Sequence, residues 1–429
     1  MILSQASPFN NRSFAIFWCS RVLTSLAFQM HIVAVGWQLY ALTGDPLDLG
    51  LVGLVQFAPV IMLVLVTGQV ADRFDRRYVV LASRLALMLC LLWLAWWSHA
   101  GAVSRSLVFA IVFLIGVCQA FQMPSSQAMI PTLVSAPQLP AAIAWGSIGF
   151  QGATVVGPAL GGFLYLAGPT VVYGVSAAFY LLSALMVLAV EQRFDKSMRK
   201  PVTRESLFAG FTFIWSQPVI LGAISLDLFM VLLGGATALM PIFAGEILAV
   251  GPWGLGLLRA APGVGAMLTA LVFAVRPLRR RVGRWMFLAA AGFGLCTIGF
   301  GLSTNLWVSL AVLVLLGASD MINIVIRQSI VQLDTPDAMR GRVSSVNGVF
   351  VGASNRLGEF ESGITAAWLG AVPATVLGGV GTLLVAALWL RWFPALWNRD
   401  GLQRSSHGAA SGRAAPTTAN AVPSSARFK

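Results

Sequence analysis

The sequence contains twelve long apolar runs, and their length indicates the class of protein to which it belongs. About 20 apolar residues in helical form cross the hydrocarbon core of a bilayer, and each run is roughly that long or longer. Strands of an outer-membrane barrel alternate apolar and polar residues instead. We therefore predict an all-α integral membrane protein with twelve transmembrane helices. The runs cover residues 14–42, 47–71, 78–99, 105–130, 141–166, 169–190, 217–244, 253–275, 285–303, 307–330, 343–369 and 373–393.

Charged residues are scarce and unevenly placed. Only 10% of the residues are charged, against about 25% in soluble domains, which excludes a soluble enzyme. The net charge of +13 would suit a nucleic-acid binder if the basic residues formed one patch. With the N-terminus inside, however, 21 Lys and Arg residues fall in the inner segments and Arg105 in the outer ones. The positive-inside rule then places both termini in the cytoplasm, so we expect contact with anionic lipid and no nucleic-acid partner.

A polar stretch at 191–206 separates the first six runs from the last six. The sequence LFAGFTFIWSQ directly after it predicts a short helix at the membrane surface. The end of the chain is rich in Ser, Ala, Pro and Thr and has little to pack. The predicted parts are an N-terminal six-helix bundle at 1–190, a cytoplasmic linker at 191–206, a C-terminal six-helix bundle at 207–393 and a disordered cytoplasmic tail at 394–429.

The two halves share a faint internal repeat. An offset of 201 residues aligns the fourth run with the tenth, and pairs Gly116 with Gly317 and Gln119 with Asp320. Similar halves joined by a linker are typical of transporters that rock around a site near the middle of the membrane. The repeat therefore favours two pseudo-symmetric bundles with a site between them.

The loop between the second and third runs has the sequence GQVADRFDRR. Gly68 permits close helix contact, and Asp72 is expected in a turn where a carboxylate can cap a helix. The spacing G-x-x-x-D-R-x-x-R-R resembles the loop signature of the major facilitator superfamily, although Asp75 stands where the superfamily often has Gly. In that superfamily the matching Asp helps to lock one arrangement of the halves, so the resemblance implies this gating role for Asp72. A purely topological cluster of positive charge is the alternative. Its arginines are Arg73, Arg76 and Arg77.

The fifth run contains the sequence GPALGG. Pro158 frees a backbone carbonyl and kinks the helix, while Gly157, Gly161 and Gly162 form a face for tight packing. The stretch resembles the core of the superfamily's antiporter signature, which is typical of exporters. The signature's upstream glycines are not matched, and Ala153 stands at one of those positions. A packing face with no bearing on direction therefore stays open.

Longer stretches narrow the resemblance. The segments at 17–21, 224–244, 334–347 and 357–363 are similar to the branch that contains the enterobactin exporter and related efflux proteins. The resemblance implies a secondary exporter of the bacterial inner membrane that acts as a monomer and moves a small amphiphilic molecule, such as a siderophore or drug-like compound, by proton antiport.

Several ionisable residues lie at membrane depth, where they are energetically expensive and are usually paired or functional. Asp227 lies about ten residues into the seventh run and Asp320 at a similar depth in the tenth, so both are candidate proton carriers. His31 and Glu359 are further candidates, with hydrogen-bonded packing as the alternative. Arg356 lies three residues before Glu359 on one helical face and can neutralise it. Candidate cavity-lining residues are Gln29, Gln56, Gln119, Gln122 and Arg356.

Three other intramembrane arginines have structural interpretations. Arg84 and Arg327 lie near cytoplasmic ends and are expected to extend to the surface, and Arg259 is expected to pair with Glu246 near the outer end. A familiar exporter arrangement, an acidic residue in the first run with an Arg in the fourth, is missing. Any proton coupling is therefore expected in the C-terminal half.

Other functions lack the motifs they would need. The sequence has no Walker-type loop for ATP and no metal-binding Cys or His spacing, so we expect neither a cofactor nor a metal. An integral-membrane enzyme would need a catalytic constellation, which three His and scattered Cys do not provide. An uptake carrier and a non-transporting membrane sensor of the same fold stay open as alternatives.

Overall fold

The structure is a computed structural model that describes residues 7–191, 204–278 and 280–402, and all regular elements of these residues are helical. Eleven segments of the described chain are long and apolar enough to cross a membrane. The helix α13 has 33 residues, about 50 Å at 1.5 Å per residue, and is more polar; with it the membrane-length segments number twelve.

The first half of the chain contains α1 (Arg12–Thr43), α2 (Pro46–Arg73), α3 (Arg76–His99), α4 (Arg105–Leu133), α5 (Leu139–Leu164) and α6 (Pro169–Leu188). The second half contains α8 (Pro218–Leu233), α10 (Gly251–Val275), α11 (Val282–Leu302), α12 (Leu306–Asp334), α13 (Asp337–Leu369) and α14 (Ala371–Trp392). Shorter elements are η1 (Pro8–Asn10), η2 (Ala136–Gln138), η3 (Tyr165–Ala167), α7 (Arg204–Ser216), η4 (Ala236–Leu239), α9 (Met240–Ile242), η5 (Phe243–Ile247) and α15 (Pro394–Trp397).

Polar side chains cap several helices where the apolar runs begin. The side-chain oxygen of Asn11 accepts a hydrogen bond from the backbone N–H of Ser13 at the start of α1, and Asp45 accepts one from Leu47 at the start of α2. Asn305 caps α12 in the same way. These bonds satisfy backbone N–H groups that have no partner within the helix. Short polar turns thus fix where the spans begin.

The seventh span departs from the continuous helix that we predicted at 217–244. Its helix α8 ends before Gly234, and the chain continues through η4, α9 and the π-helical η5. A Cβ on Gly235 would collide with the backbone of Gly358 on α13. Glycine at this point permits the close approach of the two backbones. The prediction of an unbroken helix was wrong because a span broken at a close contact has the same hydropathy as a continuous one.

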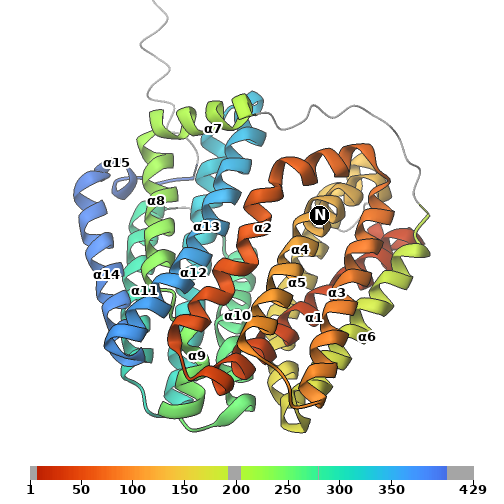
Figure 1. Ribbon diagram of the computed structural model, residues 1–429. Coiled ribbons are helices and arrows are strands. Elements are labelled where there is room, and N and C mark those ends of the chain that lie inside the picture. The colour runs from red at the N-terminus through yellow and green to blue at the C-terminus, as the bar shows by residue number, and fades with distance from the viewer. Residues whose placement is uncertain (1–6, 192–203, 279, 403–429) are drawn as a thin grey trace, which may run out of the picture.

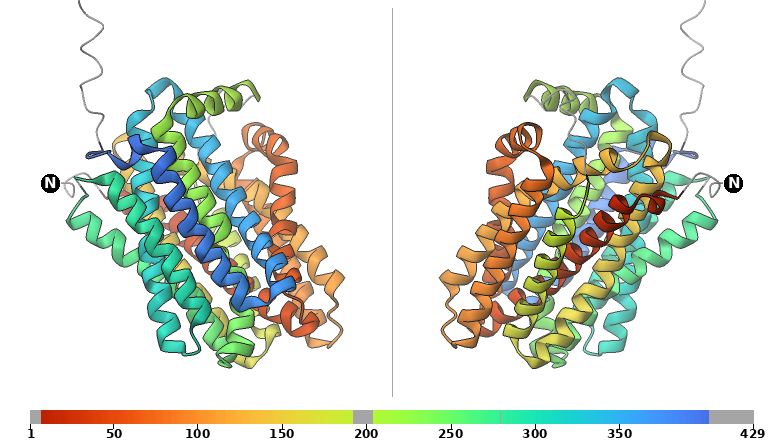
Figure 2. Two further views of the ribbon diagram at one scale, coloured as in Figure 1. Left: turned by 90° about the vertical axis from the view of Figure 1, so that its left-hand side faces the viewer. Right: turned by 90° about the vertical axis from the view of Figure 1, so that its right-hand side faces the viewer.

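The helices form two groups. α1 to α6 pack against one another, as do α8 and α10 to α14, and the groups meet where α2 crosses α13 and where α5 crosses α10. In Figure 1 the first group lies on the right and the second on the left, and Figure 2 shows the same bundle from two sides. The repeat is visible in contacts: a Cβ on Gly116 would collide with α2, and one on Gly317 would collide with α10.

The two ends of this interface differ. At the end where α1 turns into α2, a Cβ on Gly363 of α13 would lie 2.8 Å from the Cα of Gly50 on α2, and one on Gly162 of α5 would lie 2.8 Å from the Cα of Gly256 on α10. At the opposite end, where α7 lies (Figure 1), Gly68 has open space around it. We call these the α1–α2 end and the α7 end. The halves are thus in backbone contact at the α1–α2 end.

Two segments outside the main helices differ from the predicted boundaries. α7 begins within the predicted linker and packs on α13. Residues 394–402, which we assigned to a disordered tail, are packed instead: α15 contacts α8 and α11, and Arg399 donates to both carboxylate oxygens of Asp334 at 2.7 and 2.8 Å. The apolar residues of α15 explain this, since Leu396 is fully buried. Residues 192–203 of the predicted linker and residues 403–429 of the predicted tail lie outside the described residues.

Candidate functional site

Two cavities with charged and polar lining residues lie between the halves of the described chain, near the middle of the long helices. The smaller has a volume of about 210 Å³, and we call it the His31 cavity. The larger, of about 560 Å³, is the Asp320 cavity. Both are lined from both halves of the chain, so that a bound molecule would contact both. The residues common to the two are Gln56, Thr237, Arg356 and Glu359.

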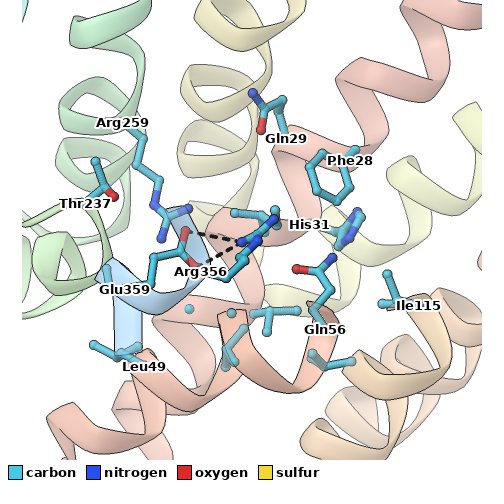
Figure 3. A pocket seen from close by; sticks show the side chains of 17 residues that line it. Phe28, Gln29, His31, Leu49, Gln56, Ile115, Thr237, Arg259, Arg356 and Glu359 are labelled. Carbon is cyan, nitrogen blue, oxygen red and sulfur yellow. Dashed lines mark hydrogen bonds and ion pairs between the residues drawn. The ribbon is translucent and has the colours of Figure 1, made fainter. Parts of the chain in front are cut away.

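Three charged residues line the His31 cavity, and we call them the guanidinium-rich group: Arg259 on α10 with Arg356 and Glu359 on α13. Nη1 of Arg356 donates to the two carboxylate oxygens of Glu359 at 2.9 and 3.2 Å. Glu359 lies between the two arginines in Figure 3. Arg259 forms no hydrogen bond and no ion pair within 4 Å with any described residue. The group therefore carries one positive charge more than its internal pair neutralises.

The expected pairing of Arg259 with Glu246 is absent from the structure. Glu246 instead accepts a hydrogen bond from the hydroxyl of Tyr40 on α1. Arg259 lies eight residues into α10 and extends over Gly36 of α1, where a Cβ would be 3.6 Å from its Nη2. The prediction was wrong because it placed Arg259 at the helix end, whereas the side chain reaches the cavity.

Glycines on the N-terminal half make room for charged side chains of the C-terminal half. A Cβ on Gly53 of α2 would collide with a carboxylate oxygen of Glu359. The carboxylate of Glu359 thus crosses the interface and lies against the α2 backbone. The position of this side chain depends on a residue with no side chain of its own.

His31 is 1% exposed and gives its name to the smaller cavity. Its Nδ1 is 2.8 Å from the carbonyl oxygen of Ala27, one helical turn earlier. Its Nε2 is buried and has no hydrogen-bond partner among the described residues. The ring also packs edge-on against Phe28, with the centroids 5.3 Å apart. The imidazole is therefore held in orientation by one nitrogen while the other stays available.

A second set of buried charges, the carboxylate-rich group, consists of Asp227 on α8 with Asp320 and Arg327 on α12. Nε of Arg327 lies 3.2 Å from Oδ2 of Asp227, and these side chains are 3% and 5% exposed. Nη1 of Arg327 also donates to Oδ1 of Asn347 at 2.7 Å. Asp320 lines the larger cavity and makes no hydrogen bond or ion pair with the described residues. This group carries one negative charge more than its ion pair neutralises.

Two arginines were expected to extend to the membrane surface, and both are buried. Arg327 is 2% exposed and occupied by the contacts just described, and Arg84 is 0% exposed. Nη1 of Arg84 donates to the hydroxyl of Ser20 at 3.2 Å and to the backbone oxygen of Ser183 at 3.0 Å. These contacts agree with the structural role that we predicted, but the predicted extension to the surface was wrong because distance along a helix does not show whether a side chain faces lipid or neighbouring helices.

Neutral amides line the cavities from the N-terminal half. Gln29 lines the His31 cavity, Gln119 lines the Asp320 cavity, and Gln56 lines both. Gln122 lines neither of these two cavities, and its buried side-chain oxygen has no partner among the described residues. The repeat pairs Gln119 with Asp320, so equivalent positions of the two halves present an amide and a carboxylate to one cavity.

The GQVADRFDRR loop differs from its sequence interpretation in two respects. Gly68 makes no close helix contact in this arrangement of the halves. Asp72 belongs to the last turn of α2, and the cap of α3 is Asp75, which accepts from the backbone N–H of Arg77 at 2.9 Å. The side chain of Asp72 lies outside the described part of the structure.

The loop's arginines bind backbone oxygens at the α7 end. Arg76 donates to Ala128 of α4 at 3.2 Å. Arg77 donates to Val190 and Leu188, at the end of α6, at 3.1 and 2.6 Å. Arg73 is the last residue of α2. The loop arginines thus tie α3 to neighbours within the N-terminal half.

The glycines of GPALGG lie at helix crossings. A Cβ on Gly157 would lie 2.5 Å from Cβ of Gln29, and one on Gly161 would meet the backbone of α1 at Met30. Gly162 faces α10 across the interface. α5 continues as a helix through Pro158. One face of α5 therefore packs against α1 of the N-terminal half, and the adjacent face packs against α10 of the C-terminal half.

A family model described as transmembrane secretion effector matches residues 3–410. The chain belongs to this family. The transmembrane secretion effector family lies within the major facilitator superfamily, so this protein is a multi-pass membrane transporter of small molecules and not an enzyme.

Relatives and solved structures agree with this assignment. The chain is 25% identical over 408 residues to the uncharacterized MFS-type transporter YfiS of Bacillus subtilis, covering 89% of this chain and 93% of the relative. It is also 25% identical over 382 residues to the enterobactin exporter EntS of Escherichia coli O1:K1, covering 87% and 86%.

Among solved structures, the chain is similar to a bacterial homologue of the lysosomal transporter Spinster in an inward-facing, occupied conformation, with a TM-score of 0.70, 14% identity and coverage of 92% and 97%. A bacterial homologue of the iron transporter ferroportin in an inward-facing state has a TM-score of 0.68, 16% identity and coverage of 90% and 99%. These similarities show the major facilitator fold.

Sequence reasoning missed several residues of the site. Thr237 lines both cavities from η4, and only the helix break brings it there. Asn347 binds Arg327 from the next helix, a contact without a sequence signal of its own. The position of Arg259 at the cavity had a usable signal, because a charged residue deep within an apolar run is usually paired or functional.

Proposed function

We propose that this protein is a secondary exporter of the bacterial inner membrane that exchanges protons for a small amphiphilic molecule, such as a siderophore or drug-like compound. Both termini lie in the cytoplasm, and the protein acts as a monomer. The observation that carries the proposal is the pair of cavities between the halves, with the unpaired carboxylate of Asp320 in the larger one. A cavity reached by both halves and a titratable group inside it are the parts that coupled exchange requires.

Asp320 is the main proton carrier in this proposal. Asp227 is already neutralised by Arg327, so its role is to hold that cation in place. Asp320 has no such partner among the described residues and borders open space in the cavity. A proton on Asp320 removes the excess negative charge of the carboxylate-rich group. Protonation and cargo binding then favour different arrangements of the halves, which is the condition for exchange.

Glu359 and His31 serve the cargo rather than the proton. Glu359 is engaged by Arg356, and His31 lies in the neighbouring cavity with one nitrogen available. Apolar and aromatic residues such as Phe28 and Leu49 line the same space, which suits an amphiphile.

The direction of transport is supported by the relatives. EntS is named an enterobactin exporter, and the GPALGG stretch resembles the signature of exporters. Alternating access is supported by the interface itself, since backbone contacts hold the α1–α2 end while Gly68 at the α7 end is free. In the proposed topology, this arrangement is open toward the cytoplasm. Gating by Asp72 belongs to the opposite arrangement, in which the α7 end closes.

Everted membrane vesicles test the proposal. The vesicles are acidified inside by respiration, and the pH gradient is followed with a fluorescent dye while enterobactin or ethidium is added. An exporter driven by antiport releases protons when a cargo is added, and Asp320→Asn reduces this release by about tenfold or more. A membrane sensor gives no cargo flux, and an uptake carrier moves cargo out of everted vesicles instead of into them.

The gating loop has its own test. Asp72→Ala is expected to lower the turnover of cargo-driven proton release while the amount of inserted protein stays unchanged. Asp75→Ala is a suitable comparison, because it removes only the cap of α3. A wild-type rate for Asp72→Ala would remove the gating role.

A further inference from the structure

We propose that the His31 cavity is a binding site for an oxyanion group of the cargo, of the carboxylate class, with Arg259 as its main ligand and Arg356 beside it. The inference rests on the proposed function in one respect, because it takes the bound molecule to be the transported amphiphile. It adds the charge of that molecule, which neither the fold nor the family determines.

The first argument for an anionic ligand comes from the charges around the His31 cavity. Among the residues that line it, Arg259 and Arg356 are cations and Glu359 is an anion. Glu359 directs both carboxylate oxygens to Arg356. The remaining positive charge therefore belongs to Arg259. An uncompensated charge away from water is unfavourable by several kcal/mol, and an anionic ligand removes that penalty.

The second argument comes from hydrogen-bond donors at the cavity that have no acceptor. No described residue accepts a hydrogen bond from Arg259, whose Nε is buried. A guanidinium presents its N–H groups in a planar fork that matches a carboxylate. The Nε2 of His31 is also buried without a partner, but its Nδ1 faces the carbonyl oxygen of Ala27, so Nε2 is an acceptor in the neutral ring and does not count among these donors. Buried polar groups in folded proteins nearly always have partners, so the unpaired guanidinium of Arg259 on this cavity indicates a missing ligand.

The third argument comes from the arrangement of the residues that line the two cavities. Figure 3 shows Arg259, His31 and Gln56 around one space, on elements of both halves. Arg259 comes from α10 and extends over Gly36 of α1. The His31 cavity, of about 210 Å³, has room for a small head group. It shares four lining residues with the Asp320 cavity, of about 560 Å³, so the two cavities adjoin each other. An amphiphile can thus place its anionic group near Arg259 and its apolar body in the larger cavity.

Binding of a matched pair of fluorescent probes tests the inference. The purified protein is placed in lipid nanodiscs, and energy transfer from its tryptophans to 1-pyrenebutyrate or to the neutral 1-pyrenebutyramide is titrated, with empty nanodiscs subtracted. We expect the carboxylate to bind about tenfold more tightly than the amide. Equal affinities in the wild-type protein would overturn the inference, and so would the absence of binding by either probe.

Variants assign the preference to Arg259. Arg259→Gln is expected to remove the tenfold preference, whereas Arg259→Lys keeps the charge and retains part of it. Arg391→Gln is the matched control, because Arg391 is exposed in the last turn of α14, and it should leave the preference unchanged. Thermal unfolding of each variant shows whether it is folded. A folded Arg259→Gln protein with the wild-type preference would overturn the inference.

Added inorganic phosphate separates the cargo's own anionic group from a free ion. If phosphate weakens the binding of 1-pyrenebutyrate and leaves the binding of the amide unchanged, the result supports a site for the cargo's own anionic group. Stronger binding of the amide in the presence of phosphate would indicate a separate ion and overturn the assignment to the cargo. None of these measurements involves protons or flux. Equal affinities of the wild-type protein for the two probes, together with intact cargo-driven proton release, would therefore reject this inference and leave the proposed function standing.

Discussion

The two charge groups of the C-terminal half that lie at the cavities have the same size and opposite excess charge. The guanidinium-rich group has two arginines and one carboxylate at the His31 cavity, and the carboxylate-rich group has two carboxylates and one arginine beside the Asp320 cavity. Each contains one ion pair and one residue without a partner among the described residues, Arg259 or Asp320. The comparison indicates that the paired residues of each group have a structural role, whereas the unpaired member is available to a ligand or a proton.

The N-terminal half offers a further contrast. It presents amides to the same cavities, and Gln119 occupies the position that the repeat pairs with Asp320. An amide does not titrate near neutral pH and carries no charge. The halves are therefore alike in fold and different in chemistry, with the charged functions concentrated on one side of the interface.

The largest expected effect comes from breaking the pair that we regard as structural. Arg327→Gln leaves Asp227 buried and unpaired, and we expect the free energy of unfolding to fall by about 3 kcal/mol. Unfolding in detergent micelles measures this change. The double variant Asp227→Asn with Arg327→Gln should recover most of the loss. If Arg327→Gln alone is as stable as the double variant, the ion pair adds nothing to the free energy of unfolding beyond its hydrogen bonds.

The next effect concerns the unpaired carboxylate. Asp320→Asn should reduce cargo-driven proton release in everted vesicles by about tenfold or more, with little change in stability, because Asp320 has no partner to lose among the described residues. Asp320→Glu keeps the titratable group and serves as the control. If Asp227→Asn and Asp320→Asn both preserve coupling, the carboxylate-rich group does not carry the proton.

A smaller effect sharpens the role of the guanidinium-rich group. Glu359→Gln frees Arg356 and raises the excess charge of the His31 cavity, so the affinity for 1-pyrenebutyrate should rise about fivefold while that for the amide stays the same. Titration in nanodiscs measures both. Glu361→Gln on the same helix is the control, since Glu361 accepts from Thr365 and does not line this cavity. A weaker affinity for the carboxylate in Glu359→Gln would contradict the assigned sign of the charge.

The smallest effect concerns access to the two groups. A Cβ on Gly50 would lie 2.9 Å from the backbone oxygen of Glu359 and 3.1 Å from the Cα of Gly363, so Gly50→Ala should open the α1–α2 end in part of the population. We expect the maleimide labelling rate of a Thr237→Cys variant, built without the native cysteines, to rise about twofold. Gly174→Ala, which meets nothing within 4 Å, should leave that rate unchanged, and an unchanged rate in Gly50→Ala would argue against a tight α1–α2 end.

The sequence was sufficient for the architecture. Hydropathy located the spans because membrane-length helices must be apolar, and the loop and repeat pointed to the superfamily. Local signals also place caps, as Asn11 and Asp45 show. The helix break before η4 was not visible, since hydropathy does not distinguish a broken span from a continuous one.

The spacing of Arg356 and Glu359 on one helix predicted their ion pair correctly, but contacts of charged residues between different helices could not be obtained in this way. Arg259, Arg327 and Glu359 each depend on contacts between helices that are far apart in the chain. Depth along a helix was available from the sequence, but the direction of a side chain around the helix axis was not. The sequence therefore identified Asp227 and Asp320 as a pair of equals, whereas the structure separates one that is neutralised from one that is not.

The glycine crossings at the α1–α2 end have a consequence for how easily the transporter changes state. Where Gly50 meets Gly363 and Gly162 meets Gly256, the two halves touch through backbone. Separating these crossings uncovers little apolar area, so water entering there meets mostly peptide groups that it can solvate. The crossings themselves then contribute little to the free-energy difference between the open and closed arrangements, and a charge gained or neutralised in the cavities weighs correspondingly more in deciding which arrangement is populated.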